Sequence, residues 1–287
     1  MKSAVWKDYS VISTGDGYKL ERWKDVILLR PDPQVIWKSS IDLDKYNGLC
    51  AKYLRSETGG GKWQYYKQMP EEWVVNYNDL KFKIKPMGFK HTGLFPEQAV
   101  NWDLMMDLIK NANREINVLN LFAYTGGATV ACAKAGASVC HVDSSKGMVE
   151  RAGENIRLSG LKDAKVRYII DDCKKFVERE IRRGRKYDAI IMDPPSYGRG
   201  PNGEMWKLEG ELYPFVSLCE QVLSDNPLFV LINSYTTGLQ PQVLKNILTK
   251  TIAKGRKGKV EAYEVGLKTE EEGIILPCGN SGIWING

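Results

Sequence analysis

The chain has 287 residues, of which 43% are hydrophobic, enough apolar material for one large domain with a smaller companion. No stretch approaches the roughly 18 consecutive apolar residues of a membrane span, and residues 1–13 lack the apolar segment of a signal peptide. The formal net charge of +6 is a mild bias toward acidic partners that does not by itself indicate nucleic-acid binding. We therefore expect a globular, enzyme-sized protein with no membrane association.

The six cysteines are scattered along the chain without a Cys-x-x-Cys pair, and there are only two histidines. This pattern predicts neither a zinc site nor a disulfide framework, so we expect no bound metal. It is typical of a protein that works in the reducing cytoplasm.

Apolar and polar residues alternate through most of the segment 1–85, which is the spacing of β-strands with one buried face. Six stretches show the alternation: YSVIST, YKLERW, DVILLR, KWQYYK, EWVVNY and LKFKIK. We predict a small antiparallel, β-rich N-terminal domain over residues 1–85. Its tryptophans form the core, the more usual role in a small β domain, or stack on single-stranded RNA. They are Trp6, Trp23, Trp37, Trp63 and Trp73.

A second domain is expected over residues 86–287. It begins with a helical pattern at 100–109, and from Asn117 short apolar runs alternate with amphipathic, helix-length segments. Strands are expected at 117–122, 138–143, 165–170, 187–193 and 228–234, with helices near 127–136, 145–159, 173–183, 210–223 and 241–251. The stretches KVEAYEVG and GIILPCGNSGIWI supply two closing strands. The repeated units predict an α/β fold with a Rossmann-like, seven-stranded, mostly parallel sheet that binds ligands at the carboxyl ends of its strands.

The first of these strands runs into a turn with two adjacent glycines, Gly126 and Gly127. The turn lacks the Gly-x-Gly-x-x-Gly pattern that suits a dinucleotide pyrophosphate, which disfavours a nicotinamide dehydrogenase. It still lets the backbone approach a ligand with one small anionic group, such as the carboxylate of a methionyl moiety. Asp143 ends the next strand 17 residues after Gly126, close to the spacing that places a carboxylate on ribose hydroxyls. The pattern predicts an adenosyl ligand without a pyrophosphate.

Structural alternatives exist for the same residues. The two glycines can serve only to pack the helix against the strand, and Asp143 can cap the helix that starts near Ser145. Ligand contact is the favoured interpretation because the glycines follow a strand and precede a helix.

Two further strands end in polar residues. After the third strand, Asp172 is predicted to accept a hydrogen bond from an adenine amino group, with Asp171 as the competing acid that instead caps the next helix. After the fourth strand, IIMDPPSYGRG contains two prolines that fix the backbone and remove two donors. Nearby carbonyls can then be presented rigidly to an amino group or a flat base. The residues concerned are Asp193, Pro194, Pro195 and Tyr197.

Five stretches in this order resemble the class I S-adenosylmethionine-dependent methyltransferases: FKHTGLFPEQ, NLFAYTGGATVACAKAGA, HVDSSKGMVERAGENIRLSGL, YIIDDCKKF and YDAIIMDPPSYGRG. More narrowly, they resemble the branch of 23S ribosomal RNA methyltransferases related to the cytosine carbon-5 enzymes. The resemblance covers roughly residues 88–200. It implies S-adenosylmethionine as cofactor and RNA, specifically 23S rRNA, as partner.

The resemblance also implies a role for each motif. Gly126 and the backbone of Tyr124 and Thr125 would face the methionyl part of the cofactor, Asp143 the ribose and Asp172 the adenine. The cofactor would be covered by Phe95 and Gln98, whose structural alternatives are a core residue and a helix entry. Beside the transferred methyl would lie Asp193, Pro194 and Pro195, with Tyr197 near the acceptor unless its ring only packs.

One departure from the family pattern concerns the acceptor atom. Methylation at carbon 5 of a pyrimidine needs a cysteine that attacks the ring, and the relatives carry Thr-Cys-Ser after the fifth strand. This chain has LINSYTTG there, without a thiol. We therefore favour a nitrogen acceptor over carbon 5, with Cys278 as a less favoured nucleophile from the last strand.

Two basic runs, KKFVEREIRRGRK at 174–186 and KGRKGK at 254–259, are candidate RNA contacts. The first is interrupted by Glu178 and Glu180, so a solvated helix face explains it at least as well, and the second is the better candidate. The predicted function is methylation of a base in ribosomal RNA. Its alternatives are a methyltransferase for a protein or small molecule and a non-catalytic, cofactor-binding RNA module.

Overall fold

The computed structural model describes residues 1–56, 60–199, 205–271 and 273–287, without the side chains of Phe89 and Arg199. Gly200, the last residue of YDAIIMDPPSYGRG, lies outside the described residues. Contacts divide the chain into two compact units. The sheet unit comprises Met1, Val100–Val265 and Gly279–Gly287, and the N-terminal unit comprises Lys2–Ala99 and Gly266–Cys278. The division into domains at residues 1–85 and 86–287 stays a prediction.

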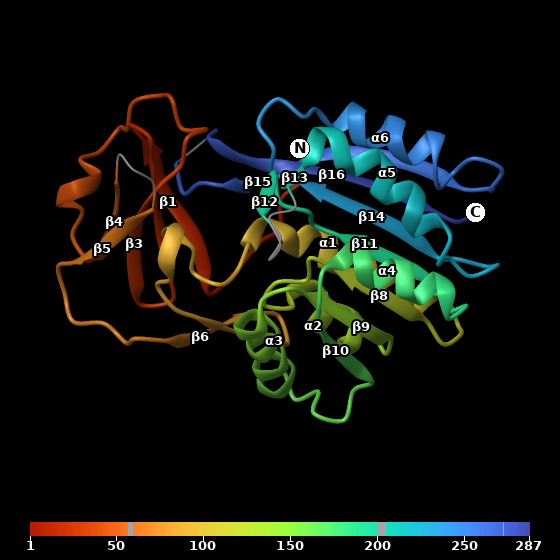
Figure 1. Ribbon diagram of the computed structural model, residues 1–287. Helices are drawn as coiled ribbons and strands as arrows, with labels where there is room; N and C mark the ends of the chain where they lie inside the picture. Colours follow the sequence, from red (N-terminus) through yellow and green to blue (C-terminus); the bar gives the residue numbers. More distant parts are fainter. Residues whose placement is uncertain (57–59, 200–204, 272) are drawn as a thin grey trace. The chain divides into compact units, whose positions relative to one another are not determined.

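A seven-stranded sheet in the order β10-β9-β8-β11-β14-β16-β15 is the centre of the sheet unit (Figure 1). The first five strands in this order are parallel, and β16 is antiparallel to β14. This arrangement confirms the Rossmann-like, mostly parallel sheet. The strands are β8 (Asn117–Leu121), β9 (Ser138–Asp143), β10 (Val166–Ile170), β11 (Ala189–Met192), β14 (Phe229–Ser234), β15 (Lys259–Lys268) and β16 (Ile275–Ile285).

Helices cover the sheet on both faces, because side chains along a buried parallel strand alternate between two apolar layers. On β8, Leu119 and Leu121 join one apolar cluster with Phe176 and Phe215 from two helices that lie along the same face (Figure 1). Asn120 points to the opposite face, where it bonds to the helix after β8. The helices are α1 (Ala99–Asn111), α2 (Gly127–Lys134), α3 (Lys146–Leu158), α4 (Cys173–Arg182), α5 (Leu208–Glu220) and α6 (Pro241–Lys250). Among the described residues, none of the helices has the length and apolar character needed to cross a bilayer.

A short hairpin after β11 was not predicted. Its strands, β12 (Tyr197–Arg199) and β13 (Met205–Lys207), pair antiparallel with Tyr197 opposite Lys207. Three residues are too few to show an alternating pattern in the sequence. The hairpin matters for function because it carries Tyr197.

The N-terminal unit contains a five-stranded sheet in the order β1-β2-β3-β4-β5 and a separate hairpin, β6–β7. The prediction of an antiparallel domain is wrong at one place, because β3 and β4 are parallel. The connection 32–48 between them is long enough for the crossover that a parallel pair needs. The elements are β1 (Tyr9–Gly15), β2 (Tyr18–Trp23), β3 (Val26–Pro31), η1 (Leu43–Lys45), β4 (Leu49–Arg55), β5 (Gly61–Tyr65), β6 (Trp73–Tyr77), β7 (Leu80–Ile84), η2 (Gly88–Lys90) and η3 (Pro96–Gln98).

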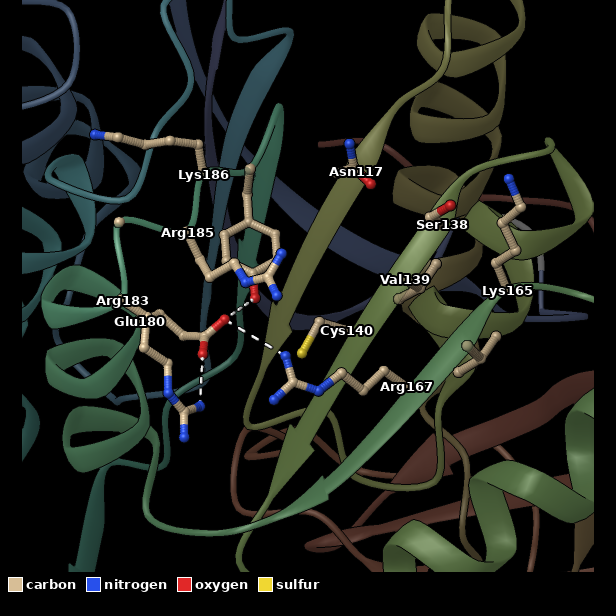
Figure 2. A pocket seen from close by; sticks show the side chains of 13 residues that line it. Asn117, Ser138, Val139, Cys140, Lys165, Arg167, Glu180, Arg183, Arg185 and Lys186 are labelled. Carbon is tan, nitrogen blue, oxygen red and sulfur yellow. Dashed lines mark hydrogen bonds and ion pairs between the residues drawn. The ribbon is translucent and has the colours of Figure 1, made fainter.

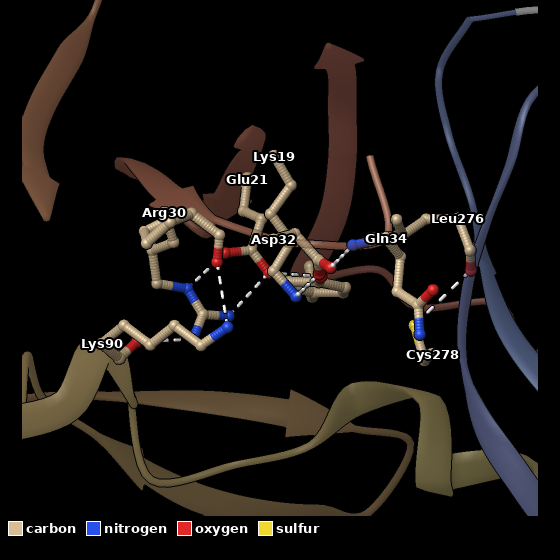
Figure 3. Close-up of polar contacts among 10 residues, drawn as sticks. Lys19, Glu21, Arg30, Asp32, Gln34, Lys90, Leu276 and Cys278 are labelled. Atoms are coloured by element: carbon tan, nitrogen blue, oxygen red, sulfur yellow. Dashed lines mark hydrogen bonds and ion pairs between the residues drawn. The ribbon is translucent and has the colours of Figure 1, made fainter. Parts of the chain in front are cut away.

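A buried ion pair lies inside the N-terminal unit (Figure 3). The guanidinium of Arg30 binds the Glu21 carboxylate through two hydrogen bonds of 2.6 and 2.8 Å, and Tyr9 donates a third of 2.7 Å. Arg30 also donates to the carbonyl of Lys90 at 2.9 Å. Both charges are therefore paired and hydrogen-bonded, and removing either one would leave the other buried without its partner. Trp23 is fully buried in the same unit, as a core tryptophan should be.

Candidate functional site

The polar residues predicted to bind a ligand follow neighbouring parallel strands at one edge of the sheet. Met192 pairs with Leu121, Leu121 with Val142, and Ile170 with Asp143. The residues that come next in the chain therefore emerge at the same, carboxyl-terminal edge. This is the edge at which sheets of this type bind ligands.

The β8–α2 turn has an unusual backbone. Phe122, Tyr124 and Gly126 have φ angles of 54°, 50° and 83°, a region that bulky side chains rarely adopt. A Cβ on Gly126 would lie 2.8 Å from the Ala152 Cβ, and one on Gly127 would lie 2.7 Å from the Trp102 ring. Both glycines are thus required by packing, whatever else they contact. Strained turns of this kind persist where the surrounding structure holds them.

Neutral, buried polar groups lie beneath the turn. The Asn120 amide donates to Thr129 Oγ1 at 2.9 Å, and Thr129 Oγ1 lies 2.9 Å from His141 Nδ1. The Asn155 amide donates to the carbonyl of Thr125 at 2.9 Å. Burial lowers the pKa of His141 to about 4, so its imidazole is neutral at pH 7. These contacts, here called the turn network, tie β8, α2, β9 and α3 to the turn.

The sequence interpretation missed the turn network. Its signal was present, because Asn120 and His141 are polar residues in the middle of otherwise apolar strands. A buried polar side chain needs a partner. Which partner it finds depends on the packing of α2 and α3.

Asp143 connects two turns through its carboxylate. One oxygen accepts from the Tyr124 amide at 2.9 Å and the other from the Ser145 amide at 2.8 Å. Ser145, not Asp143, is the N-cap residue of α3. The Asp143 side chain remains partly exposed, and a carboxylate has about four acceptor positions. About two positions therefore remain for ligand hydroxyls.

The two acids after β10 have different partners. Asp172 is the N-cap of α4 and accepts from the Lys175 amide at 2.9 Å, whereas Asp171 pairs with Arg179. The suggestion that Asp171 caps the helix is therefore wrong. Asp172 is exposed, so capping leaves part of its carboxylate accessible, and its contact with adenine stays a prediction.

After β11, the segment 193–197 is fixed by contacts from elsewhere in the sheet unit. The Trp206 indole donates to the carbonyl of Pro195 at 2.7 Å, and the Thr236 hydroxyl bonds to that of Ser196 at 2.7 Å. Pro194 is buried. One of the carbonyls predicted to face a ligand, that of Pro195, therefore already accepts a hydrogen bond from within the protein.

Tyr197 lies on β12 with 49% of its surface exposed, and its hydroxyl is 3.6 Å from Met205 Sδ. Its accessible surface is consistent with a contact to substrate.

The match to a protein family decides which family the chain belongs to. The model of the family described as S-adenosylmethionine-dependent methyltransferase matches residues 49–214, which is more than half of the chain. This chain belongs to the S-adenosylmethionine-dependent methyltransferases. Its cofactor is S-adenosylmethionine, and the resemblance to the class I enzymes is confirmed.

Individual relatives agree with the family. The crystal structure of a methyltransferase of this type from Agrobacterium tumefaciens is 32% identical, with a TM-score of 0.93 over 99% of this chain and 92% of that one. The ribosomal RNA large subunit methyltransferase K/L of Shewanella frigidimarina is 30% identical over 80% of this chain and 31% of its own length. Its counterpart in Shewanella loihica is 32% identical over 64% of this chain and 24% of its own length. The chain thus spans a third or less of the length of these two curated relatives.

The residues at the carboxyl edge fit S-adenosylmethionine. Asp143 offers unused acceptor positions for the two ribose hydroxyls, and the left-handed turn at Tyr124 and Gly126 brings backbone close to a ligand without side-chain bulk at Gly126. Asp172 offers an exposed carboxylate after the next strand. The accessible carboxylates at this edge of the sheet are therefore those that the methyltransferase family's cofactor needs as hydrogen-bond acceptors.

Phe95 and Gln98 belong to the N-terminal unit. Phe95 precedes η3 with its ring centroid 5.7 Å from that of His91, and Gln98 is buried at the end of η3. Their predicted place over the cofactor stays a prediction.

Proposed function

We propose that this methyltransferase transfers the methyl group of S-adenosylmethionine to a nitrogen of an RNA base, and that the RNA is 23S rRNA. The observation that carries the proposal is the exposed ring of Tyr197, four residues after the acid that follows β11. The names of the Shewanella relatives support a ribosomal RNA substrate. A cytoplasmic location is part of the proposal, since ribosomal RNA is found there.

The cofactor would be held mainly by the sheet unit. Asp143 would accept from the ribose hydroxyls, Asp172 from the adenine amino group, and the backbone at Tyr124, Thr125 and Gly126 would face the methionyl part. Phe95 and Gln98 would cover it. When bound, the sulfonium supplies an electrophilic methyl group, so the protein has to align the acceptor at about 3–3.5 Å and exclude water.

The acceptor base would meet Asp193, Pro194, Pro195 and Tyr197. A base in folded RNA must be extruded at a cost of a few kcal/mol, and stacking on an aromatic ring returns about 1–3 kcal/mol. Tyr197 supplies such a ring. The carboxylate of Asp193 would orient the exocyclic amine or accept its proton.

The state of the thiols supports nitrogen over carbon 5. Attack on a pyrimidine ring requires a thiolate. Desolvation, and then the neighbouring Glu97 carboxylate, raise the pKa of Cys278 well above its usual value. Burial also raises the pKa of Cys132 to about 12 and of Cys140 to about 11, and it raises that of Cys173 and Cys219.

The test is to incubate the protein with methyl-labelled S-adenosylmethionine and RNA from a strain that lacks its gene. We expect label in 23S rRNA on a base nitrogen, located by mass spectrometry of nucleosides, and none with Asp193→Ala. Asp163→Ala, which removes an exposed acid of the same unit, is the matched control and should retain activity. Label in protein or a small molecule would support that alternative, and cofactor binding without transfer would indicate a non-catalytic module. A methyl on carbon 5 would overturn the nitrogen acceptor.

A further inference from the structure

A groove of about 810 Å³ lies at the opposite edge of the same sheet (Figure 2). It is lined by the first residues of three adjacent parallel strands, Asn117 of β8, Ser138 of β9 and Val166 of β10. Because the strands are parallel, these amino-terminal ends lie one strand length from the carboxyl edge. β8 has five residues, which corresponds to about 17 Å. The groove is therefore separate from the cofactor site.

The charge of the groove is strongly positive. Figure 2 shows one wall formed by the segment between α4 and β11 and the other by β10, with β8 and β9 between them. Among the described residues that line it, one carboxylate, that of Glu180, faces five cationic side chains, which are Lys165, Arg167, Arg183, Arg185 and Lys186.

Glu180 orients two of the cations. Its side chain is fully buried, accepts from the Tyr187 hydroxyl at 2.6 Å, and lies 3.2 Å from the Arg183 guanidinium and 3.5 Å from that of Arg167. One carboxylate shared by two guanidinium groups leaves excess positive charge. A guanidinium has five N–H donors in a fixed plane, so both arginines retain donors for a second anion.

The remaining cations have weak partners or none. The side chain of Arg185 makes no hydrogen bond or ion pair with any residue that the structure describes, whereas its backbone amide donates to the Glu180 carbonyl at 3.0 Å. Lys165 lies 3.6 Å from Glu115, but both side chains are largely exposed and such pairs contribute little. Lys186 donates to the Gln221 carbonyl at 2.8 Å and retains further donors.

The basic run 174–186 is thus divided by the fold. Its helical part follows the solvated-face interpretation at Lys174, which pairs with Glu211 at 3.5 Å, and at Arg179, which pairs with Asp171. The interpretation is wrong for Glu180, which is fully buried. Its end, after α4 terminates at Arg182, faces the groove instead. The sequence alone does not separate these two parts.

We propose that this groove binds the phosphate backbone of the substrate RNA, away from the modified base. The proposal rests on RNA being the substrate. Guanidinium and ammonium groups at an exposed groove match phosphates, which position a nucleic acid without reading its sequence. The separation of about 17 Å corresponds to at least about five stacked nucleotides at 3.4 Å each. The groove would therefore hold a strand segment at least that far from the target base.

The test compares two charge-matched double variants of the full chain. Lys165→Gln with Arg185→Gln removes two cations of the groove that have no buried partner. Lys254→Gln with Lys257→Gln removes two exposed cations from the other basic run. Binding of a labelled 20-nucleotide poly-uridine RNA is measured by fluorescence anisotropy at several salt concentrations, with S-adenosylmethionine affinity and thermal midpoint as folding controls.

We expect the groove variant to bind the RNA about tenfold more weakly. The slope of log affinity against log salt should fall by about 1.4, since each phosphate contact to a single strand contributes about 0.7. The Lys254 and Lys257 variant removes the competing candidate for the RNA contact and should bind like the unmodified protein if the groove holds the RNA. Both variants should retain cofactor affinity.

Three outcomes would overturn the proposal. One is unchanged RNA binding by the groove variant, and another is that only the Lys254 and Lys257 variant loses affinity. The third is tight competition by inorganic pyrophosphate, which would make the groove a site for a small anion. If the unmodified protein methylates RNA in these cases, the proposed function stands and only the groove fails. If no methyl reaches RNA, the proposed function itself fails.

Discussion

One buried polar cluster from each unit of the protein is stabilised in a different way. Beneath the β8–α2 turn, the turn network consists of uncharged groups, Asn120, Thr129, His141 and Asn155. In the N-terminal unit, the Glu21 carboxylate is buried with the Arg30 guanidinium (Figure 3). A neutral network loses one hydrogen bond when a member is removed, whereas an ion pair leaves a buried charge. We therefore expect substitutions to cost most stability at the buried ion pair, and least at the exposed residues that follow the strands.

The largest effect is expected from breaking the ion pair. Arg30→Met leaves the Glu21 carboxylate buried without its main partner and should destabilise the protein by about 3–5 kcal/mol. Urea unfolding measures the change. Replacing both residues, with Glu21→Leu added, should recover much of the loss because neither charge of the pair is left unpaired and Lys19 keeps its partner Asp32 at 3.3 Å. Lys38→Met breaks the exposed pair with Asp16 and should leave the unfolding midpoint unchanged; an equal loss in this control would contradict the distinction.

The second-largest effect is expected on lowering the pH, which should affect the turn network at a higher pH than the buried ion pair. The pKa of His141 is about 4 in the folded protein, against 6.5 for an ordinary histidine, so the unfolded chain binds its proton first. Its contribution of about 3 kcal/mol is present above pH 6.5 and is lost as the pH falls toward 4. For Glu21, burial raises the pKa, but Arg30, Lys19 and the hydrogen bonds outweigh it and lower the pKa to about 2. Its contribution is present above pH 4.5 and is lost only toward pH 2.

Nuclear magnetic resonance can test this prediction, because the chain has only two histidines. Burial, followed by Arg30 and Lys90, lowers the pKa of His91 to about 4 as well. The variant His91→Gln leaves the imidazole resonance of His141 alone. A midpoint near 6.5 for that resonance would contradict the neutral, buried state of the turn network.

Asp143 lies between the turn and solvent. The variant Asp143→Ala should weaken S-adenosylmethionine binding about tenfold to a hundredfold. The estimate follows from the loss of charge-assisted hydrogen bonds worth about 1.5–3 kcal/mol. The variant also loses the contacts to the Tyr124 and Ser145 amides, yet it should remain folded. Calorimetry measures the affinity, with Asp163→Ala as control. Unchanged affinity in Asp143→Ala would remove Asp143 from the cofactor site.

The smallest effect on stability is expected at Tyr197, the half-exposed aromatic residue of the proposed site after β11. Tyr197→Ala should raise the KM for RNA about fivefold to a hundredfold, since stacking is worth about 1–3 kcal/mol. Tyr197→Phe keeps the ring and should behave like the unmodified protein. If Tyr197→Phe and Tyr197→Ala reduce activity equally, the hydroxyl and not the ring of Tyr197 contributes to activity.

Regular elements were predictable where the sequence pattern is long and uniform. The strand expected at 138–143 is Ser138–Asp143, and the helix expected near 173–183 is Cys173–Arg182. By contrast, β4 and the β12–β13 hairpin were missed. The residues of β4, LCAKYLR, do not alternate cleanly, and their parallel partner β3 is reached only through the connection 32–48.

Site residues were predictable as positions but not as contacts. The sequence placed Asp143 at the end of its strand and Asp172 two residues after the preceding strand, where the structure has them. It did not show that Asp172 rather than Asp171 caps α4, or that Trp206 occupies the Pro195 carbonyl. Both facts depend on which donor happens to lie nearby, and a donor from a distant segment leaves no local pattern.

By itself, the sequence determined the alternation of strands and helices and the family of the enzyme, and it predicted the carboxyl edge as the ligand edge. Those features follow from local periodicity and from short motifs, which act over a few residues. Only the tertiary structure decided that Asn155 supports the turn from another helix, that two glycines are needed against Ala152 and Trp102, and that Lys165 faces Arg185 across one groove. Contacts between distant segments depend on how the elements pack, and packing is a property of the whole fold.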